Sequence, residues 1–242
     1  MGTPLKLPVK VEKVIRHTDT VKSFHLVPLR KCPRFRPGQF LHFALDQYEP
    51  GGFWPESRVF SIANSPTRRE KLEITFALKG DFTTRMYNEV NEGDIRWIKL
   101  PFGNFFPPEE NGEVVLVAGG TGIAPFISYL EYALDEGLKN RISLLYGVRS
   151  RDFYTIGPFL DECREKLDDF DSLVFVEDGQ APEYCREVIE GIISLERLFE
   201  KRRGLPGAAF YLSGPNAMIG AMKTALEAAE VAPENIRVDE WE

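Results

Sequence analysis

The first half of the chain alternates polar and apolar residues over short runs. Residues 9–17 (VKVEKVIRH) and 71–79 (KLEITFALK) place apolar side chains at about every second position, as half-buried antiparallel strands do. Further short runs rich in Val, Ile and Phe lie at 21–29, 38–46, 57–64 and 94–100. The pattern predicts six short strands, interrupted by one helix over 83–90, that form a small antiparallel β-barrel.

In the second half the apolar residues run almost continuously, which is typical of parallel strands covered on both faces. These runs lie at 113–120, 141–148, 172–178 and 208–215, and a last strand is predicted over 235–241. Helical stretches separate them, at 125–137, 157–170, 193–204 and 216–231. Five alternations of strand and helix predict a doubly wound α/β domain with a five-stranded parallel sheet.

A segment rich in Pro, Gly and charge, residues 105–113 (FFPPEENGE), marks the predicted boundary between a barrel domain (1–108) and an α/β domain (109–242). Charge changes sign at this point. Residues 1–110 carry 17 Lys and Arg against 13 Asp and Glu, whereas residues 111–242 carry 13 against 24. The net charge of −7 and the lack of a long basic stripe argue against nucleic acid as a partner.

Composition also bounds the compartment and the metal content. No apolar run approaches the roughly 20 residues that span a bilayer, and the N-terminus lacks the apolar core of a secretory signal. Cys32, Cys163 and Cys185 form no CxxC pair, so we expect reduced thiols and no iron–sulfur cluster held by them. The three histidines stand singly in strand-like segments. We therefore expect a cytoplasmic protein without a membrane span or a metal site.

Residues 114–134 lead from a predicted buried strand through a glycine turn into a helix. Gly120 and Gly122 allow a tight turn and close approach of a ligand to the backbone. Pro125 lies early in the helix, where its missing N–H costs nothing. The N–H groups and the dipole at such a helix end favour an anion. The alternative is a glycine turn with no ligand.

Other strand ends of the α/β domain carry further candidate groups. A second glycine turn precedes the helix at residues 213–218, and two such turns on one sheet edge predict a dinucleotide crevice. Glu177 and Asp178 end the third strand, where an acidic residue can bind a ribose hydroxyl and repel a 2′-phosphate. This favours NADH over NADPH. A solvated acidic turn is the alternative, and Arg149 and Arg151 leave NADPH open.

The barrel half has two polar segments in apolar surroundings. Residues 56–65 (ESRVFSIANS) place Arg58 and Ser61 within a strand-like run. Lys79, Gly80, Thr83 and Thr84 lie at the start of the predicted helix and form a second candidate anion site.

Six motifs, in this order, resemble the ferredoxin–NADP reductase superfamily of flavin oxidoreductases over the whole chain. The family's Arg-x-Tyr-Ser, Gly-x-x-Ser/Thr and Gly-Pro-x-Gly-x-Phe segments correspond to 58–61 (RVFS), 80–83 (GDFT) and 100–105 (LPFGNF). The other three lie at 119–125 (GGTGIAP), 146–149 (YGVR) and 213–218 (SGPNAM). The resemblance implies an FAD-binding barrel and an NAD(P)-binding α/β domain. Many members of the family also carry a fused iron–sulfur domain, which we do not expect in this chain, so that any cluster would belong to a partner.

The resemblance also implies a role for each matched position. In the barrel, Arg58 would bind a flavin phosphate, Phe60 would pack on the isoalloxazine, and Gly80 with Thr83 would hold the pyrophosphate of FAD. Ser61 and Ser213 are identified as the catalytic residues, near the flavin and the nicotinamide respectively. The implied cofactor-binding residues are Arg58, Val59, Phe60, Ser61, Lys79, Gly80, Thr83, Thr84, Gly120, Thr121, Gly122, Tyr146, Arg149, Glu177, Asp178, Gly214, Pro215, Met218 and Trp241.

Three positions depart from the family pattern. Phe60 replaces the usual Tyr and offers no hydroxyl, which weakens the expected retention of flavin. Ser213 replaces the usual Cys beside the nicotinamide, so we expect slower hydride transfer. Glu177 and Asp178 stand where NADP-using members tend to carry Ser-Arg, which again supports NADH.

The implied activity is hydride transfer from NADH, or NADPH, to FAD, with FMN less expected. Electrons then pass singly to an acceptor such as ferredoxin, a cytochrome, an oxygenase component or a small molecule. The basic stretch 30–36 (RKCPRFR) suggests a second reading, a flavin-bearing electron-transfer subunit that docks on a larger complex and has little activity alone. A solvated loop is the alternative for that stretch. A third reading, a nucleotide-binding regulator without flavin, is disfavoured by the intact RVFSIAN.

Overall fold

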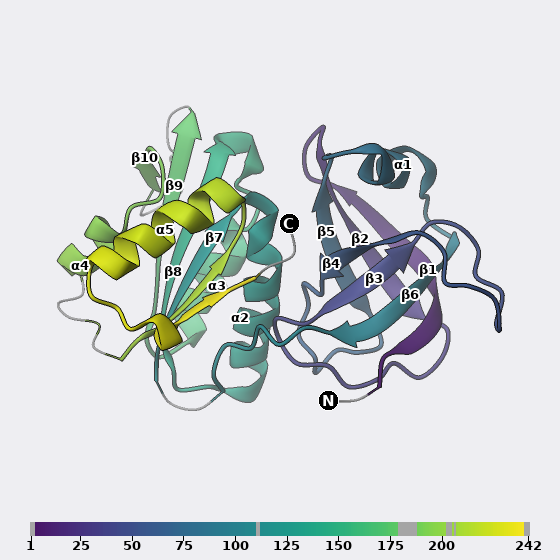
Figure 1. The fold of residues 1–242 in the computed structure, drawn as a ribbon, viewed down its shortest axis with the longest axis horizontal. Coiled ribbons are helices and arrows are strands. Elements are labelled where there is room, and N and C mark those ends of the chain that lie inside the picture. Colours follow the sequence, from purple (N-terminus) through teal and green to yellow (C-terminus); the bar gives the residue numbers. More distant parts are fainter. Residues whose placement is uncertain (1–2, 110–111, 179–187, 202–204, 206, 240–242) are drawn as a thin grey trace. The chain divides into compact units, whose positions relative to one another are not determined.

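A computed structural model of the chain describes residues 3–109, 112–178, 188–201, 205 and 207–239 (Figure 1). The chain divides into two compact units. Residues 1–106 together with 127–132 form the first, and residues 107–126 together with 133–242 form the second.

The first unit is built on one six-stranded sheet with the order β4-β3-β6-β1-β2-β5, in which every neighbouring pair is antiparallel. Its strands are β1 (Leu5–Arg16), β2 (Val21–Pro28), β3 (Phe40–Ala44), β4 (Ser57–Ser61), β5 (Leu72–Ala77) and β6 (Ile95–Phe102). Just beyond β4, the Ala63 N–H donates to the Glu73 carbonyl of β5 at 2.8 Å, and the Glu73 N–H donates to Asn64 Oδ1 at 2.8 Å. These bonds join the two edge strands, so the sheet is nearly closed, as predicted.

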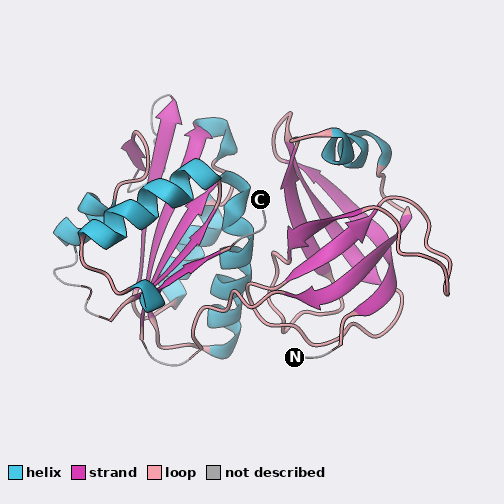
Figure 2. Ribbon diagram, viewed as in Figure 1, coloured by secondary structure: helices cyan, strands magenta, loops and turns pink. Residues whose placement is uncertain are grey.

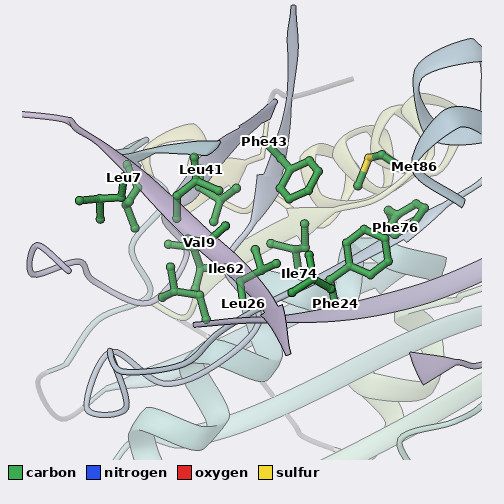
Figure 3. Packing of buried hydrophobic residues seen from close by; sticks show 14 of the residues in the cluster. Leu7, Val9, Phe24, Leu26, Leu41, Phe43, Ile62, Ile74, Phe76 and Met86 are labelled. Carbon is green, nitrogen blue, oxygen red and sulfur yellow. The ribbon is translucent and has the colours of Figure 1, made fainter. Parts of the chain in front are cut away.

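The barrel interior is filled by apolar side chains that alternate along the strands. Residues 7, 9 and 11 of β1 are buried while their neighbours are exposed or half-buried, which is the period-two pattern expected of a sheet with one covered face. Figure 3 shows side chains from β1, β2, β3 and β5 gathered with Met86 of helix α1 (Asp81–Glu89). Helix α1 contributes Phe82 and Met86 to this core, and thereby fixes its first turn against the barrel.

The second unit is built on a six-stranded, all-parallel sheet with the order β10-β9-β8-β7-β11-β12. Its strands are β7 (Glu113–Gly119), β8 (Arg141–Ser150), β9 (Phe170–Asp178), β10 (Val188–Glu190), β11 (Ala209–Ser213) and β12 (Ile236–Val238). Its α-helices are α2 (Ala124–Glu136), α3 (Gly157–Lys166), α4 (Leu195–Lys201) and α5 (Asn216–Ala228), with 3₁₀ turns η1 (Gly120–Ile123), η2 (Arg151–Phe153) and η3 (Pro233–Asn235).

Helices cover both faces of this sheet, which is why its central strands are apolar throughout (Figure 2). Residues from α4 and α5 join one buried cluster with β7, β8, β9 and β11. The prediction of a doubly wound sheet is confirmed, but the described sheet has six strands instead of five. The additional strand, β10, has only three residues and pairs with β9 alone, so it leaves no periodic signal in the sequence.

The strand order of the second unit reverses at one point in the sheet. From β7 the chain proceeds outward through β8, β9 and β10, and then returns to the other side of β7 with β11 and β12. The order therefore reverses between β7 and β11. In open α/β sheets, ligands bind outside the carboxyl ends of the strands at such a switch point.

Candidate functional site

The glycine turns predicted to bind a dinucleotide both lie at this switch point. Gly119 is the last residue of β7, and Gly120–Ile123 form the 3₁₀ turn η1 before α2. Ser213 is the last residue of β11, which pairs with β7 in parallel, and Ser213 lies opposite Ala118. The two turns therefore leave the sheet side by side, at the same edge.

The glycines of the two turns are in close contact. A Cβ on Gly122 would overlap the Ser213 carbonyl oxygen and would lie 2.6 Å from Ser213 C and 2.7 Å from Gly214 N. A Cβ on Gly214 would lie 2.8 Å from Gly119 N. In contrast, Gly120 has a φ of +53° and no heavy atom within 4 Å of its missing Cβ. Two glycines let the turns pack, and the third presents open backbone to a ligand.

Residues after β11 complete this packing. The Met218 sulfur would lie 2.7 Å from a Cβ on Gly119, and the Pro215 Cδ would lie 2.8 Å from it. Met218, on the first turn of α5, thus fills the space that the glycines leave. Gly214, Pro215 and Met218, the predicted nucleotide-binding residues of this segment, lie together around Gly119, with Pro215 in the turn that leads into α5.

A half-buried carboxyl group that the sequence did not single out as a site residue, that of Asp239, lies beside Ser213. The Ser213 hydroxyl donates to Asp239 Oδ2 at 3.0 Å, and the Asp239 N–H donates to the Leu212 carbonyl at 2.9 Å. Oδ1 of Asp239 is buried without a hydrogen-bond partner. Burial raises the pKa of Asp239 from 3.8 to about 6, although the Ser213 bond acts in the opposite direction. The sequence signal for it is the segment Asp239-Glu240-Trp241, which resembles the family's closing acidic-x-aromatic element.

The carboxyl ends of β8 and β9 hold the residues predicted to select the nucleotide. Glu177 and Asp178 are the exposed last residues of β9, and Ser150 of β8 pairs with Asp178. Arg149, also exposed, therefore stands on the strand next to Glu177. Tyr146 is different, because it is buried in the sheet and burial raises the pKa of its phenol. It has little surface to offer a ligand.

In the first unit, the RVFS segment forms most of β4. Side chains alternate across a strand, so Arg58 and Phe60 share one face and Val59 and Ser61 share the other. The Phe60 ring packs edge-on against Phe43 and Phe76, with centroids 6.5 and 6.1 Å apart. It is therefore partly engaged with the barrel core, while remaining half-buried.

The helix start that follows β5 lies next to Arg58. The Arg58 guanidinium carbon is 5.1 Å from the ring centroid of Phe82, the second residue of α1. Strand β4 and the first turn of helix α1, which are the two segments predicted to bind flavin phosphates, thus lie side by side. No heavy atom lies within 4 Å of a Cβ built on Gly80, so the backbone here is open to a ligand.

The predicted phosphate ligand Thr83 has a structural role in this helix. Its hydroxyl accepts the N–H groups of Lys79 at 2.8 Å and Gly80 at 3.1 Å, and donates to the Gly80 carbonyl at 3.0 Å. A hydroxyl has one proton and two lone pairs, so these bonds use its full capacity. The N–H groups of the first helical turn have no acceptors within the helix and are the groups left for an anion. Thr84 is exposed.

The basic stretch 30–36 contributes to a pocket in the first unit. The pocket has a volume of about 430 Å³ and is lined by Val27, Pro28, Arg30, Lys31, Cys32, Thr67, Arg69 and Glu70. It lies where β2 ends and just before β5 begins, whereas α1 follows the other end of β5. It is thus separate from the Arg58 region.

Other predicted features fall outside these clusters. Trp241 and Cys185 lie outside the described residues. Cys32 and Cys163 are buried and form no disulfide, and burial raises the pKa of Cys32 to about 11. Across the described ranges, no group of three or more His, Cys, Asp or Glu side chains is arranged to hold a metal, and no helix is long and apolar enough to cross a membrane.

Comparison with known sequences finds a family match within the second unit. Residues 116–224 match the family described as the oxidoreductase NAD-binding domain. The chain is 32% identical over 166 residues to a flavohemoprotein of Candida albicans, covering 66% of this chain and 41% of that protein. It is 33% identical over 172 residues to the sulfhydrogenase 2 subunit gamma of Pyrococcus furiosus, covering 64% and 56%. It is 28% identical over 223 residues to the reductase component of phenol 2-monooxygenase from a Pseudomonas strain, covering 89% and 60%.

Solved structures extend the likeness to the whole chain. The FAD/NAD-binding domain of a nitric oxide dioxygenase from Vibrio cholerae superposes with a TM-score of 0.83 at 22% identity, covering 96% of this chain and 97% of that one. A ferredoxin–NADP⁺ reductase of Neisseria gonorrhoeae, solved with FAD and NADP, gives 0.80 at 19% identity, covering 99% of both chains.

The resemblance drawn from the sequence is thus confirmed. Residues 116–224 match the oxidoreductase NAD-binding domain family, and the chain shares its fold with the FAD/NAD-binding domain of the nitric oxide dioxygenase and with the ferredoxin–NADP⁺ reductase. It spans about half the length of the curated relatives it matches, 41% and 56% of the first two.

Proposed function

We propose that this chain is a flavin-dependent oxidoreductase that takes a hydride from NADH onto FAD and delivers electrons singly to an acceptor. The observation that carries the proposal is the pair of glycine turns packed together at the switch point of the parallel sheet. The missing Cβ of Gly122 is what allows that packing. Beside this packing, Gly120 has a positive φ and no heavy atom within 4 Å of its missing Cβ, so its backbone can be approached closely by an anion.

The residues of the barrel suit a flavin with phosphate groups. Arg58 supplies a guanidinium, and the first turn of α1 beside it supplies backbone N–H groups over an open Gly80. We assign the barrel as the flavin domain and residues 109–242 as the nucleotide domain. FAD, when bound, supplies the chemistry that accepts two electrons from a reduced nicotinamide and releases them one at a time.

The nucleotide domain would bind and orient NADH at the carboxyl edge of its sheet. Gly120 and Thr121 present backbone to the dinucleotide, and Ser213 with Gly214 lies at the adjacent strand end. Asp239 accepts the Ser213 proton in a hydrogen bond and so fixes the rotamer of that hydroxyl. Ser61, at the end of β4, is the residue we assign to hydrogen bonding near the reactive ring of the flavin.

We propose NADH rather than NADPH as the donor. Glu177 and Asp178 place two exposed carboxylates at the end of β9, where they repel a 2′-phosphate and can accept a ribose hydroxyl. Arg149 on the neighbouring strand is the opposing feature, because it could attract that phosphate. Arg151, the exposed first residue of η2 directly after β8, is a second opposing cation, so the proposal rests on the position of the two carboxylates at the end of β9.

A second candidate function is that of an electron-transfer subunit that needs a docked partner. The pocket lined by Arg30, Lys31 and Arg69 supports it, because three cations and one carboxylate, Glu70, line it on a chain of net charge −7. A relative named as an oxygenase reductase component supports an oxygenase component as the acceptor. The buried reduced thiols Cys32 and Cys163 support a cytoplasmic location.

Turnover of an artificial acceptor separates the two candidates. The FAD-loaded chain is mixed with NADH and ferricyanide, a one-electron acceptor that needs no docking surface, and ferricyanide reduction is followed by absorbance. Steady turnover of many equivalents supports an enzyme active alone. Flavin reduction by NADH with negligible turnover supports the subunit. Failure of NADH and NADPH alike to reduce the flavin refutes both.

A further inference from the structure

The cation assigned to the flavin phosphate already has a carboxylate partner. Nη2 of Arg58 lies 2.7 Å from Oε1 of Glu56, and Nη1 donates to the Ser57 carbonyl at 3.0 Å. Two of the five guanidinium N–H groups are therefore in use. The other three remain for a ligand, but the positive charge of Arg58 is neutralised by Glu56.

The helix start beside this ion pair has its own carboxylate as well. Asp81 is the first residue of α1, directly before Phe82, whose ring lies 5.1 Å from the Arg58 guanidinium. A carboxylate in the first helical turn interacts favourably with the helix dipole and so weakens its attraction for another anion. Both elements that would bind a phosphate thus have an acidic residue next to them.

We propose that Glu56 is a specificity-determining residue that competes with the flavin phosphate for Arg58. It thereby reduces the preference of the barrel for phosphorylated flavins over riboflavin. This inference rests on the proposed function, since it concerns the flavin site. The side chains of Arg58 and Glu56 are 53% and 55% exposed, so the Glu56 carboxylate can move into water at little cost. The competition is therefore graded, and does not block the site.

The size of the effect follows from the charges. A carboxylate about 5 Å from a bound phosphate, in surroundings as wet as bulk water, weakens its binding by roughly fourfold per unit of phosphate charge. A phosphate monoester carries about 1.5 to 2 negative charges at neutral pH. Removing the Glu56 charge should therefore tighten FMN binding about eight- to sixteenfold at low salt. The gain should shrink at high salt, because exposed charges are screened there.

The experiment compares riboflavin with FMN, which differ only in the phosphate. Their dissociation constants are measured by quenching of flavin fluorescence for the wild-type chain and for Glu56→Gln. We expect the ratio of the riboflavin constant to the FMN constant to rise about eight- to sixteenfold in Glu56→Gln at low salt, with riboflavin binding unchanged.

Glu162→Gln is the matched control. Glu162 is a carboxylate of similar exposure, paired with Lys166 on α3, so the substitution changes the net charge by the same amount on the other unit. A second pair of variants, Arg58→Gln alone and Arg58→Gln combined with Glu56→Gln, tests whether Glu56 acts through Arg58. In the Arg58→Gln background, the Glu56 substitution should change the ratio much less.

Each outcome has a distinct meaning. An unchanged ratio in Glu56→Gln, or a change equal to that in Glu162→Gln, overturns the inference about Glu56. If the chain still binds flavin in that case, the proposed function stands. An undiminished effect in the Arg58→Gln background also overturns it, because the competition must act through Arg58. Absence of binding of riboflavin, FMN and FAD to every variant refutes the proposed function, and the inference with it.

Discussion

Replacing Gly122 by alanine tests the packing of the two glycine turns at the switch point. The new Cβ would lie 2.6 Å from Ser213 C and 2.7 Å from Gly214 N, whereas ordinary contact begins at 3.4 Å. These atoms are backbone at the end of β11, so no side chain can rotate away. Either η1 or the turn after β11 has to move by most of an ångström.

The expected penalty can be worked from this overlap. Overpacking of this kind destabilises by about 1–3 kcal/mol, and a backbone obstacle places Gly122→Ala at the upper end. The φ of Gly122 is not in the left-handed region, so alanine adds no backbone strain and restricts the unfolded chain, which offsets about 0.5–1 kcal/mol. The net expectation is a loss of about 2 kcal/mol, or roughly 8 °C in melting temperature for a unit of this size.

The same substitution at Gly220 is the control, and it should have the opposite sign. Gly220 lies inside helix α5 of the same unit, and nothing lies within 4 Å of its missing Cβ. Alanine there should stabilise the unit by about 1 kcal/mol, because glycine is a poor helix former.

The melting temperatures of both variants are measured by differential scanning calorimetry. The transition of the second unit is recognised because NAD⁺ raises its melting temperature. Gly122→Ala should also weaken NADH binding at least tenfold, because the displaced turn η1 no longer holds the backbone of Gly120 in its binding position. Melting of Gly122→Ala within 1 °C of wild type, with NADH affinity unchanged, would refute the packing of these turns and their role.

Three further predictions concern polar side chains of the site. Ser61→Ala should slow flavin reduction by NADH well beyond any loss of FAD, and an unchanged rate in the FAD-loaded variant would remove Ser61 from the mechanism. Replacing Glu177 and Asp178 by Gln and Asn should raise the NADPH-to-NADH efficiency ratio by about tenfold or more, because two repulsive charges are lost; an unchanged ratio in steady-state kinetics would contradict the assignment. Asp239→Asn should remove a pH dependence of stability. The raised pKa of about 6 favours the folded state at low pH, and this contribution is lost as pH rises from about 4 through 6. Calorimetry at pH 5 and pH 8 should therefore show wild type losing more stability than Asp239→Asn over that interval, and parallel losses would contradict the burial of this carboxyl.

Much of the fold could be predicted because one-sided and two-sided burial leave different patterns. Alternation in residues 9–17 reflects strand β1 with one covered face, and the continuous run at 113–120 reflects β7 with both faces covered. Strand β10 could not be predicted, because three residues at a sheet edge show no period. Helix α1 begins at Asp81, before the predicted residue 83, because the Thr83 hydroxyl caps the turn that precedes it.

Only part of the candidate site could be predicted from the sequence, because glycine turns leave a sequence signal and side-chain pairs do not. Glycines at strand ends signal close backbone packing, and the contacts of Gly122 follow that rule. Side-chain pairing has no comparable signal. Nothing in the order of residues shows that Arg58 bonds to Glu56, or that Asp239 meets Ser213, 26 positions away. Such pairs depend on rotamers and strand register, which only the folded chain defines.

The most direct test of the central claim is the visible absorption spectrum of the FAD-loaded protein under argon, before and after NADH is added. We predict a flavin spectrum that is bleached rapidly by NADH and slowly by NADPH. Faster bleaching by NADPH would contradict the assignment of Glu177 and Asp178. A protein that stays colourless after incubation with FAD and removal of the excess would contradict the flavin oxidoreductase itself.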